Sequence, residues 1–114
     1  MSKLVIAILF FVIGNILIWF QTNGQFLWKW FEKNPIFLSI VFGGFISYFF
    51  IYATKYCYEY FNQLLWPIKF VGFSVGIFTY AGMTYYFMNE GLTFKTILSL
   101  SLALLIILIQ VFWK

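Results

Sequence analysis

The chain has 114 residues, of which 64% are hydrophobic, 26% are aromatic and only 9% are charged. A soluble domain carries about a quarter charged residues, so this composition cannot cover a water-facing surface and indicates a protein of the lipid bilayer. Seven basic residues, three acidic residues and no histidine give a formal charge of +4. This charge is too sparse for a nucleic-acid-binding patch, and the lack of imidazole excludes histidine-based catalytic and metal sites.

The chain contains a single cysteine, Cys57. One thiol forms neither an intrachain disulfide nor a thiolate metal site, and we interpret Cys57 as a small apolar residue that fills space beside a helix end. We therefore expect no catalytic residues, no metal, no cofactor and no enzyme activity.

The first predicted helix covers residues 4–20, an apolar run that is interrupted only at Gly14 and Asn15. A hydrocarbon core about 30 Å thick requires roughly 20 apolar residues per helical crossing, which this run nearly supplies. No site of signal-peptide cleavage is evident after it, so we expect the helix to be retained. The amide of Asn15 should seek a partner helix, and it either holds helices together or contacts a substrate.

The second predicted helix covers residues 36–54, with Asn34-Pro35 as its start because proline favours the first helical turn. The polar stretch before this helix contains Trp28 and Trp30. Tryptophan prefers the headgroup level of a membrane, as we also expect for Trp19 at the end of the first helix. The stretch is therefore interpreted as an anchoring loop, with a short amphipathic interfacial segment as the alternative.

A loop at about residues 55–65 is predicted to lead into the third helix, residues 66–88. Lys55 and Glu59 are spaced to pair across one helical turn, or else they lie in this loop. Lys69 follows Trp66 by three residues. Its long side chain can reach the headgroups, or it can be a functional charge, since ionisable groups at membrane depth are costly to keep there.

Glycines mark one face of the third helix. Gly72 and Gly76 form a small-x-x-x-small pair, which lets a neighbouring helix approach closely in a membrane. Gly76 and Gly82 alternatively make the helix bendable, as alternating access requires. Tyr80 on the same helix either lines a cavity, where it can stack on a cation, or serves in packing.

The fourth predicted helix covers residues 93–113. The preceding loop, residues 89–92, is so short that the third and fourth helices must be antiparallel neighbours. The sequence thus predicts an all-α membrane protein with one integral membrane domain over residues 1–114, built as an up-down-up-down bundle of four transmembrane helices.

The distribution of lysines favours neither orientation of the chain in the membrane strongly. One side of the predicted bundle holds four of them, namely Lys3, Lys55, Lys69 and Lys114. The other side holds three, namely Lys29, Lys33 and Lys95. The positive-inside rule depends on such differences, and a difference of one favours cytoplasmic termini only weakly. Insertion with both termini in the cytoplasm and insertion in both orientations therefore stay open as alternatives.

Two segments resemble the small multidrug-resistance proteins and their relatives in the drug/metabolite transporter superfamily. The stretch from FSVG (73–76) through YYFMNEGLT (85–93) is similar to the family's third helix and its turn into the fourth. The stretch AILFFVIG (7–14) is similar to the start of the first helix. The resemblance implies a transporter-like homodimer in the bacterial cytoplasmic membrane.

The chain departs from that family at its working residues. The family's glutamate in the first helix, which exchanges protons for cationic drugs, corresponds to Phe11, and a tryptophan of its substrate site corresponds to about Gly72. The glycine-rich dimer face of the family's fourth helix is replaced by Ser99, Ser101 and Ala103. A proton-coupled exporter of cationic drugs is therefore not expected.

Two functions remain open. The first is a transporter-like oligomer, whose candidate substrate-facing residues are Phe11, Asn15, Lys69 and Tyr80. The second is a structural or accessory subunit that packs into a larger membrane complex and transports nothing.

Overall fold

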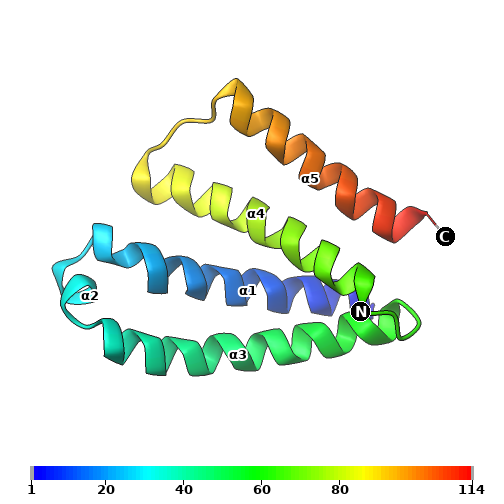
Figure 1. The fold of residues 1–114 in the computed structure, drawn as a ribbon, viewed down its shortest axis with the longest axis horizontal. Coiled ribbons are helices and arrows are strands. Elements are labelled where there is room, and N and C mark those ends of the chain that lie inside the picture. The colour runs from blue at the N-terminus through cyan, green and yellow to red at the C-terminus, as the bar shows by residue number, and fades with distance from the viewer. Residues whose placement is uncertain (1, 114) are drawn as a thin grey trace.

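The computed structural model describes residues 2–113, and within that range the chain is helical and contains no strand (Figure 1). The predicted all-α class is confirmed. The elements in chain order are α1 (Lys3–Asn23), the 3₁₀ turn η1 (Gly24–Phe26), α2 (Lys29–Lys33), α3 (Pro35–Tyr60), α4 (Trp66–Met88) and α5 (Phe94–Phe112).

Within the described residues, three segments are long and apolar enough to cross a membrane, namely Lys3–Phe26, Pro35–Tyr60 and Phe94–Phe112. These spans support the integral membrane protein that the composition predicts. The 23-residue helix α4 is not among them. Its second half, TYAGMTYY (79–86), is rich in tyrosine, threonine and glycine, which lowers its hydropathy.

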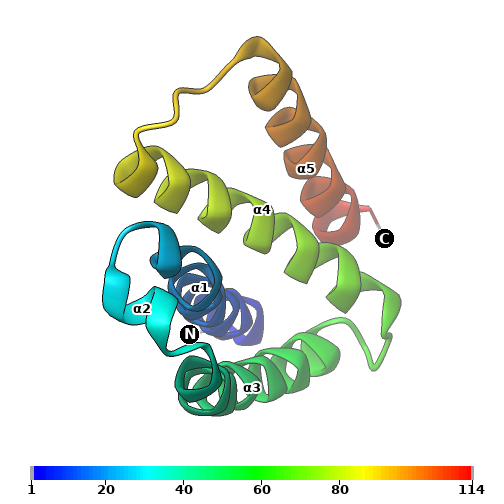
Figure 2. The ribbon, with the colours of Figure 1, turned by 60° about the vertical axis from the view of Figure 1, so that its left-hand side comes forward.

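The four long helices alternate in direction along the chain (Figure 1). Helix α1 packs against both α3 and α4, and α4 packs in turn against α5. Figure 2 shows α1 between α3 and α4, with α5 beyond α4. Helices α1 and α4 run in the same direction (Figure 1), and successive turns of α1 meet successive turns of α4, since Phe11 lies beside Gly72 and Asn15 beside Gly76.

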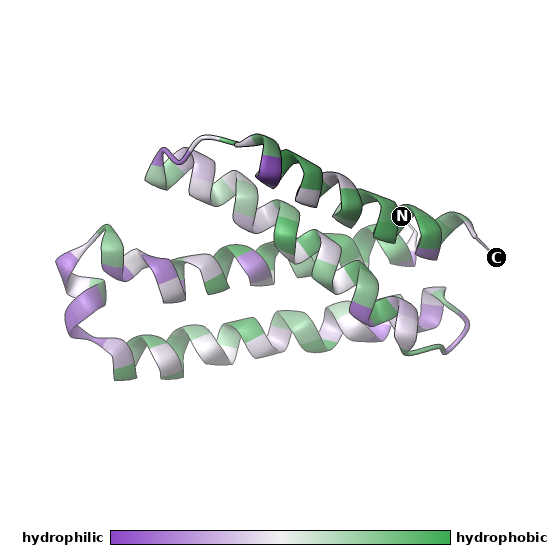
Figure 3. Cartoon of the chain, turned by 45° about the horizontal axis from the view of Figure 1, so that its top comes forward, coloured by the Kyte–Doolittle hydropathy of each residue, from purple (hydrophilic) through white to green (hydrophobic). Residues whose placement is uncertain are grey.

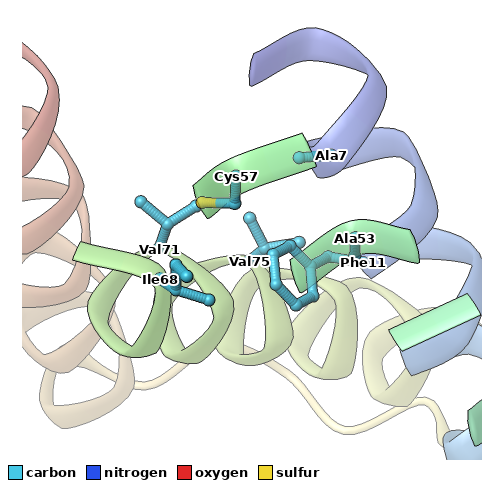
Figure 4. Packing of buried hydrophobic residues seen from close by; sticks show 7 residues of the cluster. All are labelled: Ala7, Phe11, Ala53, Cys57, Ile68, Val71 and Val75. Atoms are coloured by element: carbon cyan, nitrogen blue, oxygen red, sulfur yellow. The ribbon is translucent and has the colours of Figure 1, made fainter. Parts of the chain in front are cut away.

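The buried core is formed by three of the long helices. It contains Ala7 and Phe11 from α1, Ala53 and Cys57 from α3, and Ile68, Val71 and Val75 from α4 (Figure 4). Ala7 and Ala53 are fully buried, and such small side chains let α1 and α3 approach closely. Cys57 lies in this core as a free thiol.

Helix α5 does not share this core in the way that the predicted four-helix bundle requires. Ala103 is the one buried residue of α5 within the described range, and the hydroxyl of Ser74 donates to its carbonyl oxygen at 3.0 Å. Figure 3 shows α5 hydrophobic along most of its length. Lipid solvates apolar side chains as well as another helix does, so α5 gains little by closing the bundle.

Helix α3 is longer than predicted. It continues to Tyr60, beyond the predicted end at residue 54, because Cys57 is held in the core and Glu59 forms an ion pair with Lys3 (2.9 Å). The helix stops before Asn62 and Gln63, which have left-handed backbones with φ of 57° and 66°. The loop therefore covers residues 61–65 rather than 55–65.

Trp19, which we expected to anchor the protein at the headgroup level, is buried between helices. Its side chain is 1% exposed, and its indole N–H donates to the hydroxyl of Thr84 on α4 at 3.0 Å. Trp28 and Trp30 are both exposed. Trp30 belongs to the short helix α2 and Trp28 directly precedes it, which is closer to the alternative of a short helical segment than to a plain loop.

Candidate functional site

The contact between α1 and α4 is built from two glycines of α4 and two side chains of α1. A Cβ atom on Gly72 would lie 3.3 Å from the ring of Phe11. A Cβ atom on Gly76 would lie 3.0 Å from Oδ1 of Asn15. The absence of side chains on these glycines therefore makes room for Phe11 and Asn15, one helical turn apart on each helix.

One of the two polar atoms of the Asn15 side-chain amide forms a hydrogen bond within its own helix. Its Nδ2 donates to the carbonyl oxygen of Phe11 at 2.7 Å, which fixes the orientation of the side chain. The other amide atom, Oδ1, forms no hydrogen bond within residues 2–113. Every fully buried polar side-chain atom in that range has a hydrogen-bond partner, so Oδ1 is not fully buried. The carbonyl oxygen of the amide therefore remains accessible as an acceptor beside Gly76.

A cleft of about 360 Å³ opens at this contact. It is lined by residues of α1, α3 and α4, namely Phe11, Asn15, Phe50, Thr54, Ile68, Lys69, Gly72 and Phe73. Three of the four predicted substrate-facing residues thus lie together: Phe11, Asn15 and Lys69. The walls are mostly apolar, with one ammonium, one amide and one hydroxyl among them.

Among residues 2–113, Lys69 is the only charged residue that lines this cleft. The one ion pair among the described residues joins Lys3 and Glu59 at the same end of the molecule. Glu59 therefore does not pair with Lys55, which was one of the two alternatives for these residues, and neither residue lies in the loop, because both belong to α3. The Nζ atom of Lys55 lies instead over the rings of Tyr52 and Tyr56, at 5.9 and 5.8 Å.

Tyr80 lies apart from the other candidates. It is 52% exposed and lines a separate cavity of about 570 Å³ between α4 and α5, together with Glu90 and Lys95. Gly82 also lies away from the contact with α1, since nothing lies within 4 Å of a Cβ atom placed there. Helix α4 is continuous past both Gly76 and Gly82.

Sequence reasoning missed Phe50, Thr54, Ile68 and Phe73 as residues of the cleft. Phe50 is placed by Gly14, on which a Cβ atom would lie 3.2 Å from the Phe50 ring. Phe73 directly follows Gly72, and the spacing of Gly72 and Gly76 is the sequence signal that could have indicated this part of the cleft. The position of Thr54 on α3 follows from the pairing of α3 with α1, for which a single sequence gives no register.

Comparison of the chain with protein-family models, with curated proteins and with solved structures finds no match. The geometry of the cleft is therefore the observation that bears on function.

Proposed function

We propose that this chain is a transporter-like integral membrane protein of the bacterial cytoplasmic membrane, and that the cleft between α1, α3 and α4 contacts its substrate. The observation that carries the proposal is the convergence of Phe11, Asn15 and Lys69 on one cleft. An accessible amide oxygen, a cation and aromatic walls form a site for a small polar or amphiphilic molecule. In this proposal α4 crosses the membrane as a fourth span beside the three apolar ones.

The proposal includes a homo-oligomer, most simply a dimer. Four helices hardly enclose a pathway, whereas two copies supply eight, as the repeats of larger transporters do. Support comes from α5, on which Ala103 is the one buried residue in the described range. The exposed side chains of α5, such as Leu98, Leu102 and Leu105, are available to a second copy.

The proposed transport does not use a proton cycle at the cleft. A carboxylate that exchanges a proton for a cation needs a pKa raised by burial, and the cleft holds Phe11 and the neutral Asn15 in the corresponding region. Lys69 also makes the cleft unfavourable for a cation.

Flux into proteoliposomes tests the proposal. We suggest three probes: alanine as a neutral solute, benzoate as an aromatic anion and tetraphenylphosphonium as a lipophilic cation. We expect alanine or benzoate flux above that of empty vesicles, and no tetraphenylphosphonium flux driven by a pH gradient.

Two variants connect that flux to the cleft. Asn15→Leu removes the accessible amide and should lower the flux. Gln110→Leu removes an amide from α5, outside this cleft, and should leave the flux unchanged. Equal fluxes in Asn15→Leu and the unmodified chain would show that Asn15 is not part of the site. The absence of flux for all three probes would contradict transport.

The second candidate is an accessory subunit of a larger membrane complex, and the exposure of α5 favours it as well. Native purification in mild detergent separates the two functions. A stoichiometric larger partner supports the accessory subunit, whereas a homodimer without other chains supports the transporter-like protein.

A further inference from the structure

The cleft has a polar end and an apolar interior. Lys69 is in the first turn of α4, close to Trp66, which is 76% exposed. Tryptophan prefers the headgroup level, so the ammonium of Lys69 lies near the headgroups of a surrounding membrane. Gly76 and Asn15 lie about 10 Å deeper, because seven residues of a helix separate Lys69 from Gly76.

Nothing in the described part of the chain neutralises Lys69. The carboxylate at the same end, Glu59, is bound to Lys3 at 2.9 Å. Lys55, the remaining described lysine at that end, lies over tyrosine rings. The polar end of the cleft therefore carries a positive charge without a counter-ion from residues 2–113.

Thr54 adds a hydrogen-bond donor to the cleft. Threonine within a helix usually donates to the carbonyl oxygen one turn earlier, as Thr22 and Thr79 do here. Within residues 2–113 Thr54 forms no such bond, and its side chain is exposed on the cleft wall. Its hydroxyl is free to donate to an acidic group.

The remaining wall suits an acyl chain. Phe11, Phe50, Ile68 and Phe73 present apolar surface to the cleft, and Gly72 adds no side chain that would narrow it. A volume of about 360 Å³ is small for a ligand site and holds a headgroup with part of one chain. The cleft is not enclosed by protein, since both Lys69 and Phe73 are exposed.

We infer that this cleft binds an acidic membrane lipid, with its phosphate at Lys69 and Thr54 and an acyl chain along Phe11, Phe50 and Phe73. Basic pockets between transmembrane helices bind acidic headgroups in this way. The inference depends on the proposed function, because it names the ligand class of the same cleft.

Native mass spectrometry of the purified full-length chain tests the inference. The protein is released from nanodiscs of phosphatidylcholine that contain a minority of phosphatidylglycerol, and the retained lipids are counted. We expect phosphatidylglycerol to be enriched over its share of the bilayer. Lys69→Gln should lower that enrichment about fivefold, the effect of one lysine near a membrane surface.

Matched variants make the result specific. Lys55→Gln removes a lysine from the same end but outside the cleft and should change the enrichment less than twofold. Lys69→Arg should retain the phosphatidylglycerol enrichment, and Thr54→Val should lower it. With these two variants, a folding defect in Lys69→Gln alone does not decide the outcome. Equal losses in Lys55→Gln and Lys69→Gln, or no enrichment in the unmodified chain, would overturn the inference.

Two further outcomes separate the ligand from the transport function. Displacement of phosphatidylglycerol by soluble glycerol phosphate would show that the cleft takes a free anion and would overturn lipid binding. Flux of alanine or benzoate without lipid enrichment contradicts only the lipid inference. Lipid enrichment without any flux contradicts only the proposed transport.

Discussion

The indole N–H of Trp19 and the hydroxyl of Thr84 are joined by a 3.0 Å hydrogen bond that connects α1 to α4. Trp19 is 1% exposed, and its ring packs against Phe20 and Phe87 at centroid distances of 5.6 and 5.4 Å. An indole N–H away from water needs a partner. The pair therefore fixes how the two parallel helices are aligned at this end of the molecule.

Thr84→Val should destabilise the fold, because it keeps the side-chain shape but leaves the Trp19 N–H without its acceptor. We expect the free energy of unfolding to fall by about 0.5–1.5 kcal/mol, measured by titration with a denaturing detergent. Thr79→Val is the control, since the Thr79 hydroxyl bonds only to Val75 of its own helix (2.8 Å). Equal losses in the two variants would show that the bond to Trp19 contributes nothing.

For this chain the sequence predicts the positions of the helices well but predicts the contacts between helices poorly. Long apolar runs determine where helices form, and the start of α3 at Pro35 agrees with the expected position of proline. The predicted end of that helix was wrong because its last turn is held by Cys57 and Glu59 through contacts with other helices. Those contacts depend on packing that no local pattern reports.

The same distinction applies to the candidate site. Asn15 and Lys69 stand out in a sequence with few polar groups, and both line the cleft. Tyr80 has many equivalents among the eight tyrosines, so its residue type could not place it, and it faces another cavity. Trp19 has the residue type of a membrane-boundary anchor, but its burial depends on its alignment with Thr84.

Gly72→Ala and Gly76→Ala should each destabilise the contact between α1 and α4. The added methyl groups meet the Phe11 ring at 3.3 Å and the Asn15 Oδ1 atom at 3.0 Å, so the helices must separate or the side chains must move. We expect losses of about 1–3 kcal/mol in the free energy of unfolding, measured by the same detergent titration.

Gly82→Ala is the matched control for these variants. It lies on the same helix, and its new methyl group meets nothing within 4 Å. Alanine favours a helix over glycine, so we expect no loss of stability from Gly82→Ala. A loss in Gly82→Ala as large as that in Gly72→Ala would contradict the assigned packing.

Ala103→Leu should detach α5 from α4. Ala103 is 3% exposed and its carbonyl oxygen accepts from the fully buried Ser74 hydroxyl, so a larger side chain has no space. We expect a loss of about 1–3 kcal/mol and easier proteolysis in the loop between α4 and α5. Ser101→Leu adds similar bulk at an exposed position of α5 and should leave both properties unchanged.

Single lysine substitutions should change the orientation of the chain in the membrane. The two sides of the predicted four-span arrangement hold four and three lysines, so Lys95→Gln raises the difference to two and Lys55→Gln reduces it to zero. Because lysine is retained on the cytoplasmic side, Lys95→Gln should move a C-terminal reporter toward the cytoplasm, and Lys55→Gln should divide it more evenly. Lys3→Gln is less suitable because it also breaks the ion pair with Glu59. A reporter signal that comes from one side only and ignores both substitutions would show that the lysines do not orient this chain.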